Sequence, residues 1–312
     1  MSNGLKIKRF LQIFSVGLLS VGLAACQSDD TSEKQPEKRQ LTDAIGNKVE
    51  VPENPKRVLG SYLEDPLVAL GVTPVAQWSV ANGVQDYLKD DLKDVPTISY
   101  DLPFEAVQKT QPDLILMDSA DMVEGGKYNQ YNKIAPTYVV GKDKNNDWRE
   151  ELKEVGKVLN KENDAQKLLD EYDQKVKDAQ AELTDQKDVP SAAAIWLVNN
   201  ELFISSKNLS SGDVLYNDLK LETPKVVEEI SAKSENNWNP ISLEKLADLD
   251  ADYIFLVNSD KSGASTLDED VWKNIPAVKN NHVAEFPASS SWLYTGVIAN
   301  EQIIDDVLET IE

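Results

Sequence analysis

The stretch FEAVQKTQPDLILMDS, residues 104–119, decides the fold, because a similar stretch recurs later in the chain. The second copy is LEKLADLDADYIFLVNS, residues 243–259. In each copy an apolar residue precedes a Glu, an Asp follows that Glu after eight positions, and an apolar run follows the Asp. The repeated acids are Glu105 and Asp113 in the first copy, and Glu244 and Asp252 in the second. Each copy predicts a helix, a turn and a buried strand.

Predicted strands and helices alternate on both sides of one long helical segment. This alternation predicts an α/β fold with two lobes, each with a mostly parallel sheet flanked by helices. Between the lobes, apolar residues keep a three-to-four spacing from Asp147 to about Asp185, which predicts a long, rigid bridging helix, broken near residues 160–164. The expected segments are a lipoprotein signal peptide (1–25), a flexible tether (26–40), an N-terminal lobe (41–146), the bridging helix (147–186) and a C-terminal lobe (187–312).

The N-terminus carries a processing pattern. A basic segment at residues 1–9 is followed by an apolar run, Phe10 to Gly22, which is short for a transmembrane helix and typical of a signal peptide. Small residues then precede Cys26, the only cysteine, as in the bacterial lipobox. We expect Cys26 to be lipidated and to hold the protein at the extracellular face of the bacterial cytoplasmic membrane. Residues 27–40 contain no aliphatic or aromatic residue, which predicts the flexible tether.

The charge of the chain excludes polyanionic partners. The formal net charge is −22, and removal of residues 1–25, with three basic residues and no acid, takes it to −25. Such a surface repels nucleic acid and anionic lipid headgroups. We therefore expect no nucleic-acid partner, contact with the membrane only through the lipid anchor, and a monomer.

The sequence motifs of common enzyme classes are missing, although its many acids leave a carboxylate pair for glycoside hydrolysis open. His282 is the only histidine, and there is no GxSxG motif, Walker A motif or Rossmann glycine fingerprint. No cysteine or histidine cluster is available for a bare transition metal. We expect a binding protein without catalytic residues, cofactor or directly bound metal. The alternative class is an enzyme or a surface interaction protein on the same scaffold.

Aromatic residues follow or end several predicted strands. Ligands of open α/β lobes bind beyond the carboxyl ends of the strands, so two such lobes would line one cleft with these rings. Lys207 is the main cation in the loops expected to border that cleft. The candidate ligand-binding residues are Tyr62, Trp78, Tyr100, Trp196, Lys207, Trp238, Trp292 and Tyr294.

Taken together, these stretches resemble the class III substrate-binding lipoproteins of bacterial ABC transporters, in the iron–siderophore branch. The matching stretches are TDAIGNKVEVPENPKRVL (42–59), LVALGVTPV (67–75), FEAVQKTQPDLIL (104–116), KIAPT (133–137), ISLEKLADLDADYIFL (241–256) and VWKNIPAVKNNHV (271–283). The resemblance implies two α/β lobes bridged by a rigid helix, a ligand in the inter-lobe cleft and delivery to an ABC permease dimer. It also implies that Glu105 and Glu244 dock to the two permease subunits.

The small number of arginines indicates what charge the ligand carries. From Leu41 onward only Arg57 and Arg149 are present, whereas an anionic chelate requires several cations in the cleft. This favours a neutral or cationic ferric siderophore of the hydroxamate type. Hydroxamate-binding members of the family tend to carry an aromatic residue and an arginine in the loop that matches residues 207–212, which here reads KNLSSG. Ferric citrate, haem and cobalamin therefore stay as alternatives.

Overall fold

The computed structural model of the chain describes residues 38–81, 83–143, 145–184, 189–260 and 265–311. These residues belong to one compact unit that begins at Pro36. The predicted signal peptide (1–25), the lipidation site at Cys26 and the tether up to residue 37 lie outside the described residues. None of the described helices has the length and apolar character that crossing a bilayer requires.

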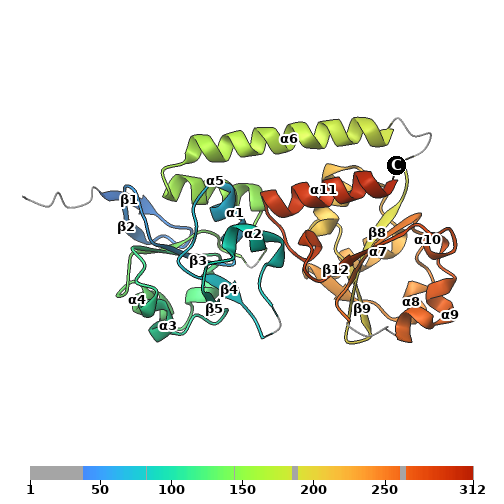
Figure 1. Ribbon diagram of the computed structural model, residues 1–312, viewed down its shortest axis with the longest axis horizontal. Coiled ribbons are helices and arrows are strands. Elements are labelled where there is room, and N and C mark those ends of the chain that lie inside the picture. Colours follow the sequence, from blue (N-terminus) through green and yellow to red (C-terminus); the bar gives the residue numbers. More distant parts are fainter. Residues whose placement is uncertain (1–37, 82, 144, 185–188, 261–264, 312) are drawn as a thin grey trace, which may run out of the picture. The chain divides into compact units, whose positions relative to one another are not determined.

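The N-terminal lobe is built around a small parallel sheet (Figure 1). Its strands are β1 (Lys38–Thr42), β2 (Lys48–Pro52), β3 (Val58–Ser61), β4 (Gln77–Ser79), β5 (Thr97–Ser99), β6 (Leu114–Met117) and β7 (Thr137–Val139). Its helical segments are α1 (Glu64–Ala69), η1 (Asp86–Leu88), α2 (Lys89–Leu92), α3 (Phe104–Lys109), η2 (Ala120–Val123) and α4 (Lys127–Tyr131). The parallel sheet has the order β3-β6-β7, while β4 pairs with β5 and β1 with β2.

Both faces of this sheet are covered, because side chains of β6 point alternately to opposite sides. Leu114 and Leu116 pack in the cluster that includes α1 and α5 (Trp148–Val158). Ile115 and Met117 pack in a second cluster with residues of α3 and α4. Continuous burial on two faces explains why the sequence of β6 is an unbroken apolar run.

The C-terminal lobe has one larger sheet of mixed direction. Its strands are β8 (Ala192–Val198), β9 (Glu201–Ser205), β10 (Trp238–Pro240), β11 (Tyr253–Asn258) and β12 (Val283–Pro287). Its helical segments are η3 (Asp213–Asp218), α7 (Lys225–Ser231), α8 (Leu243–Leu246), η4 (Ser265–Asp268), α9 (Asp270–Lys273), α10 (Pro276–Lys279), η5 (Ser291–Leu293) and α11 (Val297–Ile311). The strand order is β10-β9-β8-β11-β12, in which β8, β11 and β12 are parallel and β9 runs antiparallel to β8. The prediction of two α/β lobes with largely parallel sheets is confirmed.

The repeated Asp has the same structural role in both lobes. Asp113, just before β6, accepts hydrogen bonds from the backbone N–H groups of Lys56 and Arg57, at 2.7 and 2.9 Å. Asp252, just before β11, accepts from the backbone N–H and the hydroxyl of Ser191, at 2.9 and 2.8 Å. Each Asp thus ties the start of its own strand to the start of the parallel neighbour, β3 or β8.

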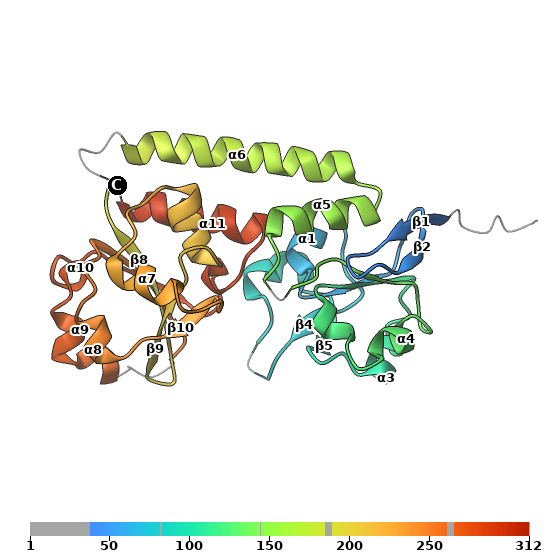
Figure 2. The ribbon, with the colours of Figure 1, turned by 180° about the vertical axis from the view of Figure 1, so that it is seen from behind.

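The predicted bridging segment consists of two helices that meet close to the break predicted near residues 160–164. Asp147 caps α5 by accepting hydrogen bonds from the backbone N–H groups of Arg149 and Glu150. The chain turns at residues 159–161, with Asn160 at a φ of +60°, and continues as α6 (Glu162–Thr184). Figures 1 and 2 show α6 lying over α5 and α11.

Residues 38–40, predicted to belong to the tether, lie in strand β1, which begins at Lys38. Arg39 donates hydrogen bonds to the carbonyl oxygens of Lys157 and Val158, at 3.1 and 2.8 Å. The guanidinium thus adds hydrogen bonds to carbonyl groups at the C-terminal end of α5, where the intrahelical ladder ends. Residues 38–40 therefore belong to the folded part.

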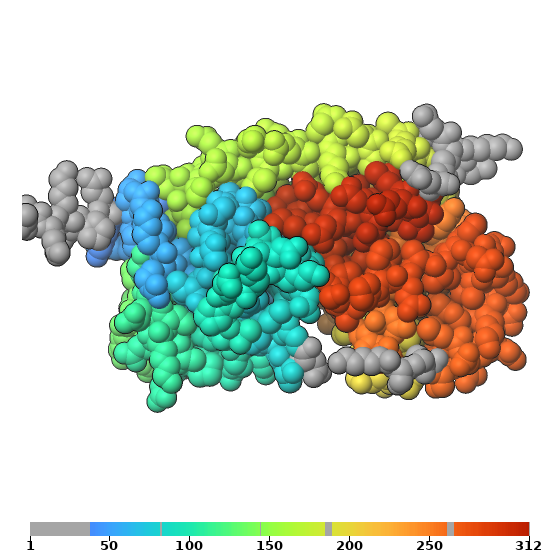
Figure 3. Space-filling model, in the orientation of Figure 1, coloured from blue at the N-terminus to red at the C-terminus, as the bar shows by residue number. Residues whose placement is uncertain are grey.

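The two lobes share a continuous apolar core. One buried cluster includes Leu67 of α1, Leu152 of α5, Tyr172 of α6, Ile303 of α11 and the inner residues of β8 and β11. Figure 3 shows α6 in yellow-green and α11 in red lying side by side. The helices α1, α5, α6 and α11 thus join the two sheets through packed side chains.

A buried carboxyl group fixes the start of α11. Asp65, at the beginning of α1, accepts hydrogen bonds from the backbone N–H groups of Ile298 and Ala299, at 3.2 and 3.0 Å. The Tyr87 hydroxyl also donates to Asp65, at 3.0 Å. Gly296 makes this approach possible: its φ is +145°, and a Cβ there would lie 2.3 Å from Asp65 Cγ.

Replacement of Gly296 tests this contact. Gly296→Ala combines an unfavourable φ with a clash against a buried carboxyl group, so we expect the free energy of unfolding to fall by about 1–3 kcal/mol. Gly83→Ala is the matched control, because the nearest atom to a Cβ there lies at 4.0 Å and its φ is ordinary. Urea unfolding of both variants measures the difference. Equal stability of the two would contradict the assigned role of Gly296.

Candidate functional site

An inner pocket lies between residues of the N-terminal lobe, α5 and the C-terminal lobe. Its volume is about 230 Å³. Tyr62 and Asp118 directly follow β3 and β6, so the carboxyl ends of parallel strands contribute its N-terminal wall. The lining residues are Tyr62, Asp118, Asn145, Asn146, Asp147, Trp148, Glu151, Asn208, Leu209, Ser210, Asp213, Asn237 and Thr295.

An outer pocket continues from the inner one. Its volume is about 730 Å³, and it shares Asn145, Asn208 and Leu209 with the inner pocket. Its other lining residues are Asp121, Lys142, Asp143, Ser206, Ser231, Ser234, Glu235 and Asn236. Small-molecule sites commonly hold several hundred Å³, so the inner pocket alone is too small for a large chelate.

The inner pocket contains strained backbone from both lobes. Tyr62 and Ser210 have φ values of +63° and +51°, in the left-handed region that side chains other than glycine rarely adopt. Three residues after Ser210, at Asp213, begins η3, a π-helical turn. Strained residues and π-helical turns concentrate at functional sites, where the surrounding structure holds them in place.

Several buried polar atoms in the pocket wall have no hydrogen-bond partner among the described residues. They are the indole Nε1 of Trp148, the hydroxyl of Ser210 and the amide oxygen of Asn237. Trp148 and Ser210 are each only 5% exposed. An unpaired buried polar group is costly, so these atoms favour a polar ligand that pairs with them.

The two pockets are strongly acidic. Among the described residues they are lined by seven carboxyl groups and a single lysine, Lys142. The Arg149 guanidinium lies 2.6 Å from Asp218 and 3.6 Å from Asp213, so it offsets only one acid of the inner pocket. Like charges oppose binding, so this cleft disfavours anionic ligands.

Two of these acids form a pair. The carboxyl groups of Asp118 and Glu151 hydrogen-bond each other. Burial raises the pKa of Asp118 to about 6. Burial, and then the charge of Asp118, raises the pKa of Glu151 well above its usual range. Two carboxyl groups in contact retain a shared proton because both cannot ionise at low cost.

Of the predicted ligand-binding residues, Tyr62 lines the inner pocket and Trp78 lies behind it. The rings of Tyr62 and Trp78 meet edge to face at 5.3 Å. Tyr100 is 60% exposed and follows β5, outside the residues that line either pocket.

The predicted aromatic residues of the C-terminal lobe lie in its sheet and core. Trp196 in β8 and Trp238 in β10 are half-buried and pack against each other at 6.1 Å. Trp292 is fully buried, stacks on Phe255 at 4.7 Å and donates its indole N–H to Asp306 at 2.7 Å. The placement of Trp292 in the cleft is therefore corrected: Trp292 lies in the short helical turn Ser291–Leu293, and its ring packs in the core.

Tyr294 and Lys207 border the pockets without lining them. The Tyr294 ring lies 5.1 Å from that of Tyr87, and its hydroxyl donates to the carbonyl of Val84 at 3.1 Å. Lys207 forms an ion pair with Glu228 at 3.3 Å. Lys207 therefore already has a charge partner, although its chain neighbours line the outer pocket.

The strand-end rule failed in the C-terminal lobe because its sheet is mixed. Residues Asn208 to Ser210 follow β9, and Asn237 precedes β10. Since β9 is antiparallel to β8, these residues lie at the end of the sheet where β8 begins. The pocket acids were also missed, because the sequence is acidic throughout; only the position of Asp118, directly after a buried strand, could have identified it.

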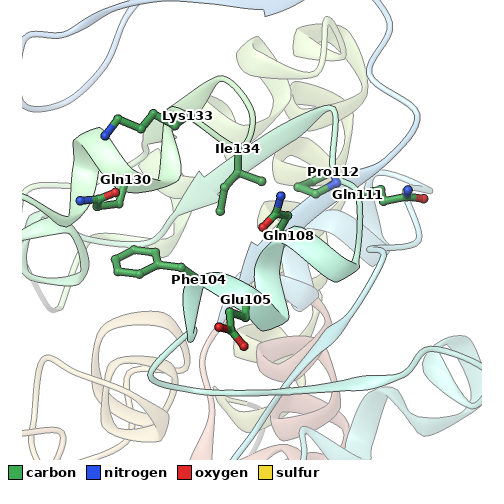
Figure 4. Close-up of a pocket in the computed structure, with 8 residues that line it drawn as sticks. All are labelled: Phe104, Glu105, Gln108, Gln111, Pro112, Gln130, Lys133 and Ile134. Atoms are coloured by element: carbon green, nitrogen blue, oxygen red, sulfur yellow. The ribbon is translucent and has the colours of Figure 1, made fainter.

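A second surface feature surrounds Glu105. A groove of about 590 Å³ is lined by Phe104, Glu105, Gln108, Gln111, Pro112, Gln130, Lys133 and Ile134. Figure 4 shows Glu105 at the start of α3, pointing away from Lys133. Phe104 beside it is 39% exposed, a large value for an aromatic ring.

Glu244 has matching surroundings in the other lobe. It is exposed at the start of α8, and the apolar residue before it, Leu243, is 37% exposed. Leu243 lines a groove of about 480 Å³. Neither Glu105 nor Glu244 pairs with another side chain in the part of the chain that the structure describes, so both carboxylates are available to a partner.

Within the described residues, no group of three His, Cys, Asp or Glu side chains is arranged to hold a metal ion.

Known proteins resemble the chain over nearly its whole length. The Iron(3+)-hydroxamate-binding protein YxeB of Bacillus subtilis is 26% identical over 320 residues, with 96% of this chain and 97% of YxeB covered. The Iron(3+)-hydroxamate-binding protein FhuD of the same organism is 27% identical over 316 residues, with 97% and 98% covered.

A solved structure shares the fold. Staphylococcus aureus SirA, crystallised in complex with staphyloferrin B, matches with a TM-score of 0.72 at 29% identity, covering 87% of this chain and 98% of SirA. A family model described as Periplasmic binding protein matches residues 60–289, well over half of the chain. This chain therefore belongs to the periplasmic binding protein family.

Proposed function

We propose that this protein is a lipid-anchored substrate-binding protein that captures a ferric siderophore in the two connected pockets and delivers it to an ABC permease. The observation that carries the proposal is the inner pocket, to which both lobes contribute strained backbone and buried polar atoms without partners. The names of the relatives YxeB and FhuD support iron(III) hydroxamate as the ligand class. Cys26 would carry the lipid anchor.

The charges of the cleft refine the ligand. Seven carboxyl groups and one lysine line the two pockets. An anionic citrate or catecholate chelate would be repelled there, while a neutral or cationic hydroxamate chelate is tolerated or attracted. The indole N–H of Trp148 and the hydroxyl of Ser210 are donors that suit the oxygen atoms of a metal-bound hydroxamate.

Ligand binding can be followed on the chain from Gln27 to Glu312 by tryptophan fluorescence. We expect a ferric hydroxamate to quench the emission at sub-micromolar concentration, and ferric citrate, haem and cobalamin to bind far more weakly. Trp148→Phe removes one hydrogen-bond donor from the pocket, so its Kd should rise about two- to tenfold.

Trp272→Phe is the matched control for this titration. Trp272 is also 5% exposed but lies in α9, outside the pockets, so its replacement should leave the Kd unchanged. Thermal melting verifies that both variants fold. The proposed ligand class is wrong if ferric citrate, haem or cobalamin binds more tightly, and the proposed function fails if no iron chelate binds.

The duplicated stretch suggests how the protein meets a permease dimer. Glu105 and Glu244 begin matched helices, and each follows an exposed apolar residue. A protein with two similar lobes can present one such carboxylate to each subunit of a symmetric partner. Glu105 lines one groove, and Leu243, next to Glu244, lines another; neither groove shares a lining residue with the ligand pockets.

The double variant Glu105→Ala/Glu244→Ala tests docking. We expect uptake of labelled ferric hydroxamate by cells to fall at least tenfold, with a Kd within twofold of the original value, because the ligand pocket is untouched. Glu171→Ala/Glu182→Ala removes the same charge from exposed positions on α6 and should transport normally. Normal uptake by the Glu105→Ala/Glu244→Ala protein would refute the docking role.

A further inference from the structure

The Asp118–Glu151 pair occupies a defined place in the inner pocket. Asp118 is the first residue after β6, and Glu151 lies in the first turn of α5. Both line the pocket, and their carboxyl groups are in hydrogen-bonding contact. The pair therefore joins the end of the N-terminal sheet to the helix that leads toward the other lobe.

The groups that face this pair bring it no positive charge. They are Tyr62 after β3, Asp65 of α1, Asp147 at the cap of α5 and Asp213 of η3 across the pocket. The Arg149 guanidinium is engaged by Asp218 and Asp213. Asn146 donates the one further side-chain hydrogen bond to Asp118, and it is neutral. The described residues thus supply the pair with no cationic partner.

A second observation points to a ligand at the same place. The Nε1 of Trp148 and the Oγ of Ser210 are buried in the wall of this pocket without a hydrogen-bond partner. One comes from α5 and the other from the strained loop after β9. The pocket therefore combines donors for the oxygen atoms of a chelate with acceptors that still need a cation.

We propose that the Asp118–Glu151 pair binds a primary ammonium group carried by the ferric chelate, and so makes this protein selective for cationic over neutral chelates. This inference rests on the proposed function and names the charge class of its ligand. An ammonium group has three N–H donors, enough to reach both carboxylates. Charge-assisted hydrogen bonds of this kind are stronger than neutral ones.

Binding of the ammonium group should release a proton from the pair. In the free pocket the two carboxyl groups share one proton. When the ammonium group donates to both, that proton leaves to solvent, and no covalent bond forms or breaks. Asp118, with a pKa of about 6, is mostly protonated at pH 5.5 and ionised at pH 7.5, so the preference for the cationic chelate should increase over this range.

The test uses the chain from Gln27 to Glu312 and two probes that differ in one charge. The probes are a linear ferric trihydroxamate with a terminal primary amine and the same chelate with that amine acetylated. We expect the original protein to bind the amine form at least about tenfold more tightly. The double variant Asp118→Asn/Glu151→Gln keeps the shape of the pair without its charge, and should bind both forms within about twofold of each other.

Two controls separate recognition from folding. Glu150→Gln removes an exposed carboxylate of the same helix, ion-paired to Lys153, and should keep the tenfold preference. The acetylated chelate should bind the Asp118→Asn/Glu151→Gln protein as tightly as the original, which shows that its pocket is intact. Calorimetry in two buffers of different ionisation enthalpy should detect release of about one proton with the amine form only.

Each other outcome overturns the inference in a recognisable way. Equal affinity of the original protein for both probes excludes ammonium recognition and leaves the proposed function in place. Equal weakening of both probes in the Asp118→Asn/Glu151→Gln protein assigns the pair to structure alone. Absence of binding by either probe overturns both the inference and the hydroxamate ligand that it rests on.

Discussion

The contact between Asp65 and the first turn of α11 is the constraint on which the arrangement of the lobes depends. This carboxyl group of the N-terminal lobe accepts hydrogen bonds from the backbone N–H groups of Ile298 and Ala299. Those N–H groups lie at the N-terminus of α11, and a helix N-terminus favours negative charge. Burial nevertheless raises the pKa of Asp65 to about 6, so the three hydrogen bonds do not fully offset the loss of hydration. The contact therefore contributes geometry more than stability. It places α11 beside α1, and the next residues back along the chain, Tyr294 and Thr295, then reach the other lobe and the inner pocket.

The duplicated stretch shows which parts of the fold could be predicted from the sequence. Its apolar runs became β6 and β11, and its Asp residues became the ties between neighbouring strand starts, a role that needs only a short acceptor at a fixed place. Such local features follow from residue order and spacing. The break between α5 and α6 was also foreseen near residues 160–164, because the helical spacing fails there. The mixed direction of the C-terminal sheet was not foreseen. It arises because the tight turn at Asn199 and Asn200 makes β9 run antiparallel to β8.

The residues of the ligand site were harder to predict from the sequence than the strands and helices. Aromatic residues were assigned to the cleft by their position at strand ends, and of these only Tyr62, after a parallel strand, lines the inner pocket. Trp292 has serines before it and looks exposed in sequence, yet its ring is held in the core by Phe255 and Asp306. Trp148 is buried as a core residue would be, yet its indole also lines the inner pocket. Which edge of a buried ring faces a cavity depends on tertiary packing, which residue spacing does not encode.

The acidity of the protein has two physically different components. Carboxylates on the surface are hydrated and screened within about 10 Å at ordinary salt, so they keep the protein soluble and act weakly on any one ligand. Asp118 and Glu151 are desolvated, and a charge there interacts far more strongly with a bound group. The surface acids can attract a cationic chelate toward the cleft at low ionic strength. They cannot select among cationic chelates by the position of the positive charge on the molecule. That discrimination requires acceptors at one fixed place, and the pair at the end of β6 provides them because a packed helix, α5, holds Glu151 against the sheet.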